Sequence, residues 1–545
     1  MTPTEVWENF DANLSPLEIS TVFTNTTDNL VHTRVSFLAD GENGLRTCAD
    51  VFFDDRWVDK RSAVLVLPSL NNLSYDEEIK KIVEDGFIAC VLDYCAADDN
   101  AIPFPNDLKF ACVPECSKHL DSIPENARHT PWFVWAKIAR RAITALQSLP
   151  YVDEDRISLL GLGAGAEIGW IVAGIDKRVY SFVAINGGGY RWAHNDARFA
   201  NETSSMQSDE QQAFSAGVGA ETYAKFISCP TVFVNSRYSR RCDVDRAGDM
   251  LDLVKSNAKQ LIVSSASEEQ IEAAEFDAVL NLLKGGMTAD KMSMPTIAFE
   301  TAENKLYVHI NTSHKAIEKN LFVSFGEPNS AYRFWQSLPL EQKVGTHEYT
   351  CNIPVEDEND IVVCYATFKY ADGNIGSTKV IGIRPSKHGV VGNSEKTLRH
   401  SRIIYDGSMG NGSFIAQTRD AIIEDDCTFT QQGPFGIVGI SAKKGNLSLC
   451  RSAREKAFRE QMSALHFDVY SPVKRNLEVA IYVQPDFKKF TARTQLQGGE
   501  FWQKVLLEYT DFKSEEGKTL PKFSNTKVLS IIDVEGLLLN NFLWI

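Results

Sequence analysis

Two kinds of hydrophobic pattern divide the chain. Up to about residue 287, continuous apolar runs alternate with helix-like stretches. Such runs are typical of strands covered on both faces, so the pattern predicts a doubly wound, mostly parallel sheet with helices on either side. The predicted strands are Ser62–Leu70, Phe87–Asp93, Ile157–Leu160, Tyr180–Asn186, Pro230–Asn235 and Gln260–Ser264, and the clearest predicted helices lie near Tyr75–Asp85 and Pro131–Leu149.

The stretch 293–386 has a different texture, with apolar and polar residues alternating in period two. The alternation is clear in Lys305–Ile310, Asn320–Phe325 and Ile361–Tyr370, and Asp372-Gly373-Asn374 is a tight-turn signal. A segment of this length without a good helix predicts a small β-sandwich. We expect its aromatic residues Trp335 and Tyr370 to belong to the core.

The stretch 395–545 is again rich in predicted strands, and a polar, Gly-containing linker precedes it at Ser386–Lys396. The chain of 545 residues is therefore predicted to form three domains, 1–288, 293–386 and 395–545. Its net charge of −16 is uneven, at about +2 for the last domain and about −18 for the rest. An acidic surface disfavours binding to nucleic acids and to membrane surfaces.

The first residues and the cysteines bear on localisation and cofactors. The first Lys or Arg is Arg34, and no apolar run reaches the length of a membrane span, so with Met1 taken as native we predict a cytoplasmic protein. Cys112 and Cys116 form a C-x3-C pair without a second pair nearby, so we predict no metal site and no cofactor. Cys351 and Cys364 are placed on neighbouring predicted strands where they could face each other, and buried free thiols are the favoured interpretation.

The most informative motif is RISLLGLGAGAEIGW, at residues 156–170. A buried strand, a glycine-rich turn and a helix follow one another, which is the context of the G-x-S-x-G nucleophile elbow. The five turn residues are Gly161, Leu162, Gly163, Ala164 and Gly165. The outer glycines allow strand and helix to approach closely, but the central Gly163 has no side chain that could attack a substrate. A dinucleotide fingerprint is disfavoured, because the turn follows several strands instead of the first.

The residues around this turn resemble the dienelactone-hydrolase and acetyl-xylan-esterase-like branch of the α/β-hydrolases. The resemblance rests on Val152-Asp153, Arg156-Ile157, the glycine turn and Asp176-Lys177-Arg178-Val179, and it extends from about Trp57 to Gly285. It implies an α/β-hydrolase fold in which a serine, an acid and a histidine form the catalytic triad.

The positions that the resemblance assigns to the triad are all without the expected residue. Arg237 or Tyr238 stands where an acid is usual, and Asp243 and Asp245 are expected to begin the next helix. The segment after Ser264 holds no histidine before His309. Loss of nucleophile, acid and base together predicts a degenerate site. We expect the turn geometry to persist, because glycine removes a backbone strain of about 1–3 kcal/mol.

Several polar residues are candidates for a binding crevice above the turn. They are His129, His194, Arg237, Tyr238, Arg240 and Arg241. The arginines could hold a carboxylate or phosphate, while pairing with nearby acids is the structural alternative. Ser69 follows the first strong strand, where the oxyanion-hole loop would lie, and it is interpreted as a turn residue.

The two β segments carry weaker resemblances. Ser330–Trp335 and Ala371–Ser377 resemble parts of immunoglobulin-like domains that are appended to such hydrolases. The last segment resembles galactose-binding-like jelly rolls, through Trp502, Val505, Leu507, Asp511, Phe512, Lys513, Gly517, Leu520, Asn541 and Trp544. Many carbohydrate-binding modules share that architecture. Sugar recognition needs aromatic faces and polar groups exposed together, so the role depends on which face Trp502, Tyr482 and Tyr470 occupy.

These observations predict a catalytically degenerate hydrolase-like protein with a binding or scaffolding role. The candidate ligands are a carbohydrate, an acyl-sugar or a small anion. One alternative is an active carbohydrate esterase, a carboxylic-ester hydrolase that uses displaced residues. The other is a purely structural multidomain protein whose crevice has collapsed.

Overall fold

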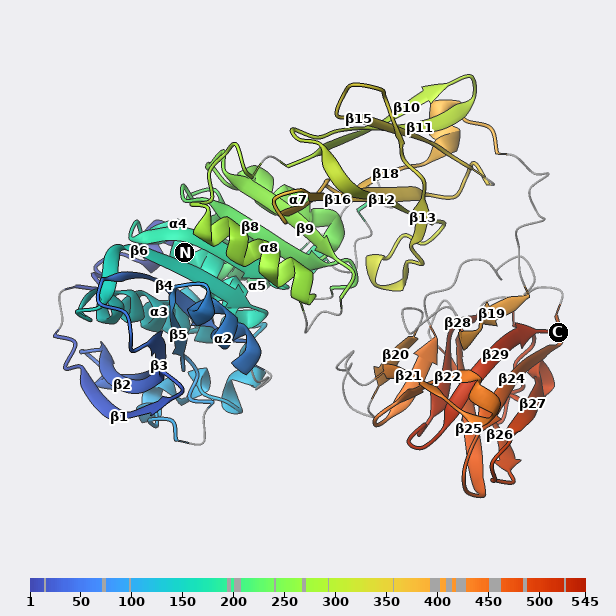
Figure 1. The fold of residues 1–545 in the computed structure, drawn as a ribbon. Coiled ribbons are helices and arrows are strands. Elements are labelled where there is room, and N and C mark those ends of the chain that lie inside the picture. The colour runs from blue at the N-terminus through green and yellow to red at the C-terminus, as the bar shows by residue number, and fades with distance from the viewer. Residues whose placement is uncertain are drawn as a thin grey trace.

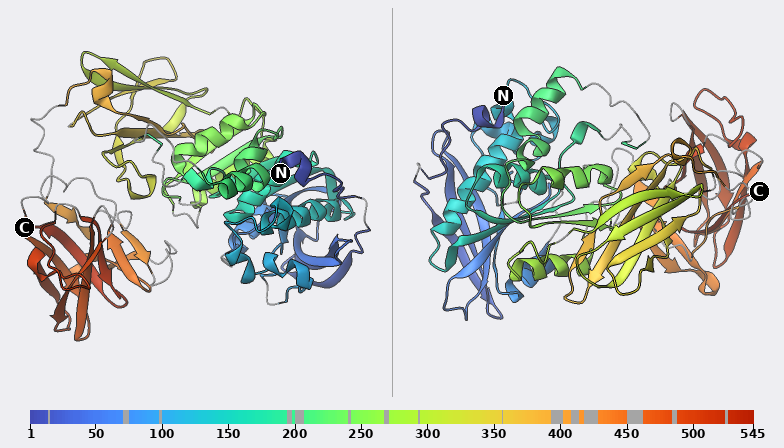
Figure 2. Two further views of the ribbon diagram at one scale, coloured as in Figure 1. Left: turned by 180° about the vertical axis from the view of Figure 1, so that it is seen from behind. Right: turned by 90° about the horizontal axis from the view of Figure 1, so that it is seen from above.

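A computed structural model describes the chain except for residues 14–15, 71–74, 98–99, 194–197, 200–206, 240–241, 267–270, 293, 356, 393–401, 408–413, 418–427, 450–461, 484–487 and 524–525. An α/β half comes first, a smaller β region continues from it, and a separate all-β body contains the C-terminus (Figures 1 and 2).

The central sheet of the first half is mixed and mostly parallel. Its strands are β1 (Ser20–Thr27), β2 (Leu30–Asp40), β3 (Leu45–Asp54), β4 (Arg61–Leu67), β5 (Ile88–Leu92), β6 (Val152–Leu162), β7 (Val179–Ile185), β8 (Thr231–Ser236) and β9 (Lys259–Ser264). They lie in the order β1-β2-β3-β5-β4-β6-β7-β8-β9. The pairs from β5 through β4 to β9 are parallel, whereas β1, β2, β3 and β5 pair antiparallel.

Helices cover both faces of this sheet, as the continuous apolar strands predict. The helices are α1 (Pro3–Val6), α2 (Asp76–Glu84), α3 (Pro131–Gln147), α4 (Ala164–Ile175), α5 (Asp209–Val218), α6 (Ala220–Ala224), α7 (Val244–Leu253) and α8 (Ala273–Lys284). One core contains residues of α3, α4, α6 and α7, together with Ala63, Leu65 and Leu67 of β4. The core on the opposite face contains residues of α2 and α8 with Val64 and Val66.

The sheet does not end at the predicted domain boundary. Beyond β9 it continues through β17 (Ile375–Ser377), β16 (Val362–Tyr370), β12 (Ala316–Phe325) and β13 (Gln336–Leu338), and β18 (Ile381–Ile383) also pairs with β16. Strand β17 pairs with β9 through Ser377 opposite Leu261, and Ser377 Oγ accepts a hydrogen bond from the Val263 N–H at 2.9 Å. A separate four-stranded sheet faces this extension with β10 (Thr296–Ala302), β11 (Lys305–Asn311), β15 (Glu348–Ile353) and β14 (Glu341–Gln342).

The last part consists of two antiparallel sheets around one core. The first sheet contains β19 (Ile403–Tyr405), β21 (Thr428–Gln432), β22 (Val438–Ala442), β24 (Ala464–Tyr470), β27 (Trp502–Glu508) and β29 (Leu538–Trp544). The second contains β20 (Phe414–Gln417), β23 (Asn446–Leu449), β25 (Arg475–Val483), β26 (Lys488–Leu496) and β28 (Thr526–Ile532). The apolar residues of both sheets meet in the core between them.

The observed elements confirm the predicted fold class, a mostly parallel α/β sheet followed by antiparallel β-sheets. The prediction for the two cysteines on neighbouring strands is wrong in one respect, because Cys351 on β15 and Cys364 on β16 belong to different sheets of one core, and both are buried free thiols. Trp335 is buried, and Tyr370 packs against the sandwich core while remaining half-buried. No helix in the described part of the chain is long and apolar enough to cross a membrane.

Candidate functional site

The glycine turn lies between β6 and α4, at the carboxyl edge of the parallel sheet. Gly163 is the N-cap of α4, with φ +53° and ψ −116°, a conformation that favours glycine. A Cβ on Gly165 would lie 1.9 Å from the Leu67 carbonyl oxygen, and one on Gly161 would lie 2.4 Å from the Gly165 carbonyl oxygen. The predicted tight turn and the role of its outer glycines in close strand–helix approach are therefore confirmed.

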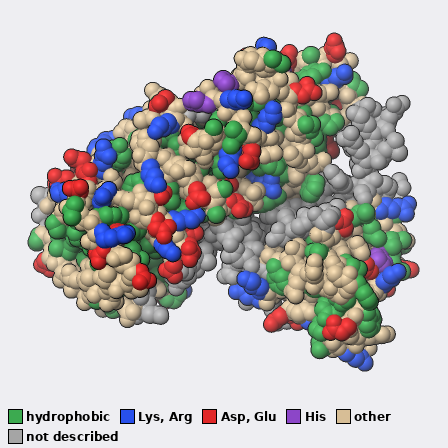
Figure 3. Space-filling view, viewed as in Figure 1, with side chains coloured by type: hydrophobic (Ala, Val, Ile, Leu, Met, Phe, Trp, Pro, Cys, Tyr) green, Lys and Arg blue, Asp and Glu red, His purple; other side chains and the backbone are tan. Residues whose placement is uncertain are grey.

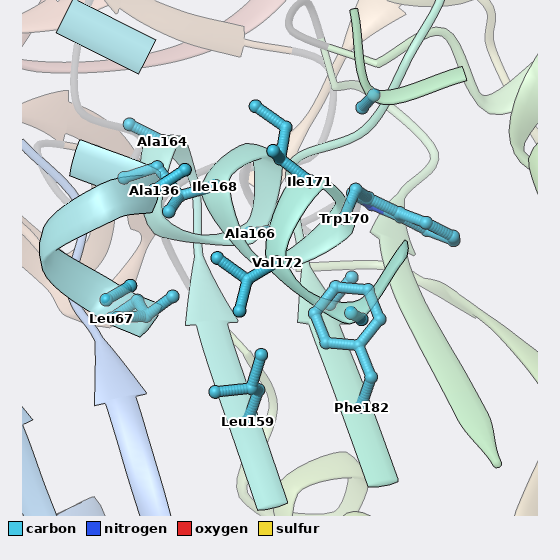
Figure 4. Close-up of a cluster of buried hydrophobic side chains, with 14 of the residues drawn as sticks. Leu67, Ala136, Leu159, Ala164, Ala166, Ile168, Trp170, Ile171, Val172 and Phe182 are labelled. Carbon is cyan, nitrogen blue, oxygen red and sulfur yellow. The ribbon is translucent and has the colours of Figure 1, made fainter. Parts of the chain in front are cut away.

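Helix α4 is held rigidly beneath this turn. Figure 4 shows its apolar side chains packed over Leu159 and Phe182 of the sheet. Trp170 packs edge-on against Phe182 and Phe233, with ring centroids 5.1 and 5.4 Å away, and its Nε1 donates to the Gly187 carbonyl at 3.0 Å. The loops after β6 and β7 are thus fixed to each other.

Ser69 lies directly over the turn. Its Oγ would be 2.8 Å from a Cβ placed on Gly163, which is closer than real Cβ contacts occur. The residue is only 9% exposed, and its Oγ has no hydrogen-bond partner among the described residues. The hydroxyl that lies over the elbow therefore comes from the loop after β4, and a serine at Gly163 would collide with it.

The strand that should lead to the catalytic acid ends in residues committed to structural bonds. Asn235 of β8 donates from Nδ2 to the Cys242 carbonyl at 3.0 Å, and Ser236 Oγ donates to the Ala266 carbonyl at 2.7 Å. Both side chains are fully buried. They hold the loops after β8 and β9 in place, and neither is an ionisable group.

Arg237 and Tyr238 follow β8 and lie against the β extension. The Arg237 guanidinium lies 5.0 Å from the ring of Tyr238 and 5.3 Å from that of Phe322. Its Nη1 donates to the Tyr365 hydroxyl at 3.5 Å. Phe322 belongs to β12 and Tyr365 to β16, so Arg237 contributes to the junction with the β extension.

Asp243 and Asp245 begin α7, as predicted from the sequence. Asp243 is the N-cap and accepts a hydrogen bond from the Asp245 N–H at 3.1 Å. Asp245 is bound by both terminal nitrogens of Arg333, with Nη2 to Oδ2 at 2.7 Å, and both side chains are completely buried. Burial raises the pKa of Asp245 to about 6, and the attraction of Arg333 opposes that rise.

The position expected for the base is occupied by a serine–glutamate pair. Ser264, the last residue of β9, donates to Glu275 Oε2 of α8 at 2.7 Å. Burial raises the pKa of the Glu275 carboxyl, while the Ser264 hydroxyl opposes the rise. His309, the next histidine along the chain, lies on β11, where its Nε2 is 2.7 Å from Glu300 Oε2 of β10.

Among the remaining candidates, the structure describes His129. His129 lies at the end of a 3-10 turn (Ala127–His129), where its half-exposed ring approaches Glu125 at 3.5 Å. His194, Arg240 and Arg241 lie outside the described residues. Sequence reasoning missed Glu167, a buried acid in the first turn of α4 that pairs with Arg191, and Arg191 in turn lies 4.8 Å from the ring of Trp132. No pattern in the sequence marks that pair, because its members lie on different elements.

Among the described residues, the groups around the turn are either uncharged or held in ion pairs. The start of α4 offers backbone N–H groups and Ser69 a hydroxyl, whereas Glu167 and Asp245 are held in ion pairs. Among the described residues, no group of three or more His, Cys, Asp or Glu side chains could hold a metal ion.

Two of the three aromatic residues whose placement bears on sugar recognition lie side by side in the last part. Tyr470 of β24 is paired with Trp502 of β27, and their ring centroids are 6.2 Å apart. Both are half-buried, and Trp502 Nε1 donates to the Pro434 carbonyl at 3.0 Å. Tyr482 instead lies on the other sheet, where it packs against Val528, which Tyr332 also contacts.

Part of the chain matches a known protein family. Residues 140–275 match the family model "BAAT / Acyl-CoA thioester hydrolase C terminal". Among solved structures, acetyl xylan esterase 1 from Thermoanaerobacterium sp. JW/SL YS485 is similar, with 14% identity and a TM-score of 0.42 over 52% of this chain and 94% of that one. An acetyl xylan esterase from Paenibacillus sp. R4 has 13% identity and a TM-score of 0.41, over 52% of this chain and 92% of that one.

A glucuronoyl esterase from Solibacter usitatus gives 10% identity and a TM-score of 0.38, over 52% of this chain and 91% of that one. No curated protein sequence matches the chain. The family match and the topology of the sheet lead to one conclusion. The first half of the chain has the fold class of the α/β-hydrolases, a mostly parallel sheet covered by helices, and antiparallel β-sheets follow it.

Proposed function

We propose that the hydrolase-like domain is not a serine hydrolase and that it acts as a binding and scaffolding body. The observation that carries this proposal is Gly163, which has no side chain and lies beneath the Ser69 hydroxyl. Nucleophilic catalysis requires an activated hydroxyl or thiol with a base in hydrogen-bond reach. The Ser69 Oγ has no such base among the described residues.

The strand ends support the same proposal. In a triad, the acid orients the base and the base activates the nucleophile. Here Asn235 holds a backbone carbonyl and Ser264 holds Glu275, so both strand ends serve the packing of loops and helices. Restoring one catalytic residue would leave the other two functions absent.

The attachment of the β extension supports a scaffolding role. Ser377 joins β17 to the edge of the hydrolase sheet, and the buried Asp245–Arg333 pair links α7 to the loop between β12 and β13. The same loop reaches the last β body, because Glu327 pairs with Lys527 of β28. A rigid connection of this kind suits a protein that presents its β domains at fixed positions.

A fluorophosphonate probe and a p-nitrophenyl acetate assay test the absence of catalysis. We expect no labelling and no hydrolysis above the uncatalysed rate. The matched variant is Ser69→Ala, which removes the hydroxyl over Gly163 without leaving a buried polar partner unpaired. Labelling of the wild type that is lost in Ser69→Ala would establish instead an esterase with a displaced nucleophile.

A second candidate function, carbohydrate binding, is favoured by the pair Tyr470 and Trp502. Their half-buried rings lie on adjoining strands beside Asp468 and Lys504, so that aromatic faces and polar groups are present together. A glycan array tests this role, and Tyr470→Ala should abolish any signal. Tyr482→Ala, on the other sheet, is the control that should keep it. An array without signal, or a signal that Tyr470→Ala retains, contradicts this assignment.

A further inference from the structure

Strand β1 is an open edge of the long sheet. It is the terminal strand of the described sheet order, and it pairs antiparallel with β2, from Ser20 opposite Ser36 to Thr27 opposite Leu30. Its residues are exposed except for Phe23, which is half-buried. Such a strand presents unpaired backbone N–H and C=O groups that can form hydrogen bonds with another strand.

The composition of β1 separates it from the other edges. Proteins protect edge strands with charges, prolines or short length. Among the edge strands in the described residues, β10 carries Glu300, β26 carries Lys488, Lys489 and Arg493, and β27 carries Lys504 and Glu508. The edges β13, β14, β20 and β21 have at most five residues. By contrast, β1 has eight residues, STVFTNTT, with neither charge nor proline.

Strand β1 is also fixed in an extended conformation by the turn that follows it and by side-chain contacts. A two-residue turn, Asp28-Asn29, joins β1 to β2 with positive φ at both residues, as tight hairpins require. The hydroxyls of Thr24 and Thr33 are 3.2 Å apart, and Glu18 just before the strand pairs with Arg46 at 2.8 Å. In Figure 3 the surface over β1, at the lower left, is largely tan, the colour of uncharged polar side chains and backbone. A preorganised edge loses little conformational freedom when it pairs.

We propose that β1 pairs antiparallel with β1 of a second copy of this chain across a two-fold axis. Beyond the bulge at Thr21–Phe23, the stretch Phe23–Thr27 is regular. With the axis at Asn25, Thr24 lies opposite Thr26 and Phe23 lies opposite Thr27 of the other copy. Threonine pairs and aromatic–β-branched pairs stabilise antiparallel strands, and no like charges face each other. The chain thereby joins two sheets into one through an isologous contact.

Size-exclusion chromatography with light scattering tests this dimer. The wild type should approach twice the mass of one chain as concentration rises into the tens of micromolar. Asn25→Lys brings two like charges together at the axis, and it should shift the dissociation constant upward at least tenfold. Val58→Lys adds the same charge at a 94% exposed loop position of the same domain, so it should leave the dimer intact.

Hydrogen–deuterium exchange gives a second readout. Amides in 23–27 should become more protected as the protein concentration rises, and this protection should be absent in Asn25→Lys. Equal melting temperatures for the two lysine variants would show that Asn25→Lys remains folded. A wild type that is monomeric throughout, or a dimer that Asn25→Lys leaves unchanged, overturns the proposal.

Discussion

The turn at Gly163 and the contact between Asp245 and Arg333, called the junction below, both involve the α/β half of the chain, yet their chemistry differs. The turn is rich in glycine, and one hydroxyl lies over it, that of Ser69 in the loop after β4, which has no hydrogen-bond partner among the described residues. The junction contains a completely buried bidentate ion pair, Asp245 with Arg333. Under the proposed function, the turn keeps the shape of a nucleophile elbow but does not take part in catalysis. The junction concentrates buried charge where another part of the chain attaches.

This difference indicates which features the chain depends on for its structure. Buried charges are costly unless they are paired, so a buried pair is a strong constraint on how its two elements sit. Asp245 begins α7, and Arg333 lies between β12 and β13. The junction therefore specifies the position of the β extension, while the turn at Gly163 specifies only the packing of α4 against the sheet.

The largest expected effect comes from breaking the junction with Arg333→Ala. Removing one partner leaves Asp245 buried without compensation, which typically costs about 3–5 kcal/mol. Urea denaturation followed by tryptophan fluorescence should show a correspondingly lower midpoint. Arg56→Ala is the matched control, because Arg56 pairs with Asp54 at an exposed site and its loss should leave the midpoint unchanged. Equal midpoints for the two variants would show that the buried pair does not stabilise the fold.

The pH dependence of that loss should identify Asp245 as its source. Burial raises the pKa of Asp245 to about 6 in the folded protein, above its unfolded value, so ionising it in the fold is unfavourable without Arg333. The deficit of Arg333→Ala should then grow as pH rises from 5 to 8, because protonated Asp245 needs no partner. Melting temperatures of both proteins across that range measure it. If the stability lost in Arg333→Ala became smaller as pH rises, a titrating group other than Asp245 would be responsible.

Much of the α/β core could be predicted from local sequence, and the junction could not. The apolar runs at Ile157–Leu160 and Pro230–Asn235 fall within β6 and β8, because full burial leaves a continuous signal. The helix start at Asp243 was also predictable from its N-cap residue type. Pairing of Asp245 with Arg333 depends on residues far apart in the chain, and no periodicity records such a contact.

The same limit applies at the candidate site. The glycine spacing predicted the turn at Gly163, but the hydroxyl that covers it comes from Ser69 on another strand end. The β1–β3 strands were not recognised, although their pairing forms one edge of the sheet. The continuation through β17 rests on one residue pair, Ser377 with Leu261, which is too short to leave a pattern.

The substitution Gly163→Ser should sharpen the view of the turn, with a smaller effect than that at the junction. A non-glycine residue at φ +53° is strained by about 1–3 kcal/mol, and its Cβ also meets Ser69. Gly44→Ser is the control, because Gly44 has φ +64° and no atom within 4 Å of a built Cβ, so only backbone strain applies. We expect Gly163→Ser to lower the melting temperature more than Gly44→Ser and to restore no esterase activity.

Adding Ser69→Gly to Gly163→Ser should recover the part of the loss that comes from the collision. The double variant should then melt close to Gly44→Ser, and it should remain inactive if the proposed loss of the acid and the base is right. A double variant no more stable than Gly163→Ser alone would show that Ser69 moves aside at no cost. Hydrolysis by either variant would contradict the proposed loss of catalysis.

The smallest expected effect lies at the contact between the β extension and the last β body. Lys527 pairs with Glu327 and lies 4.9 Å from the ring of Tyr332, but its side chain is 20% exposed and that of Glu327 10%. Water and salt weaken such a pair, so Lys527→Met should cost no more than about 1 kcal/mol. High salt should reduce the difference from wild type here, whereas it should leave the deficit of Arg333→Ala unchanged, because that pair is sealed from solvent. Denaturation at two ionic strengths measures both responses. If Lys527→Met cost as much as Arg333→Ala, the two contacts would hold the chain together equally, and burial would not distinguish them.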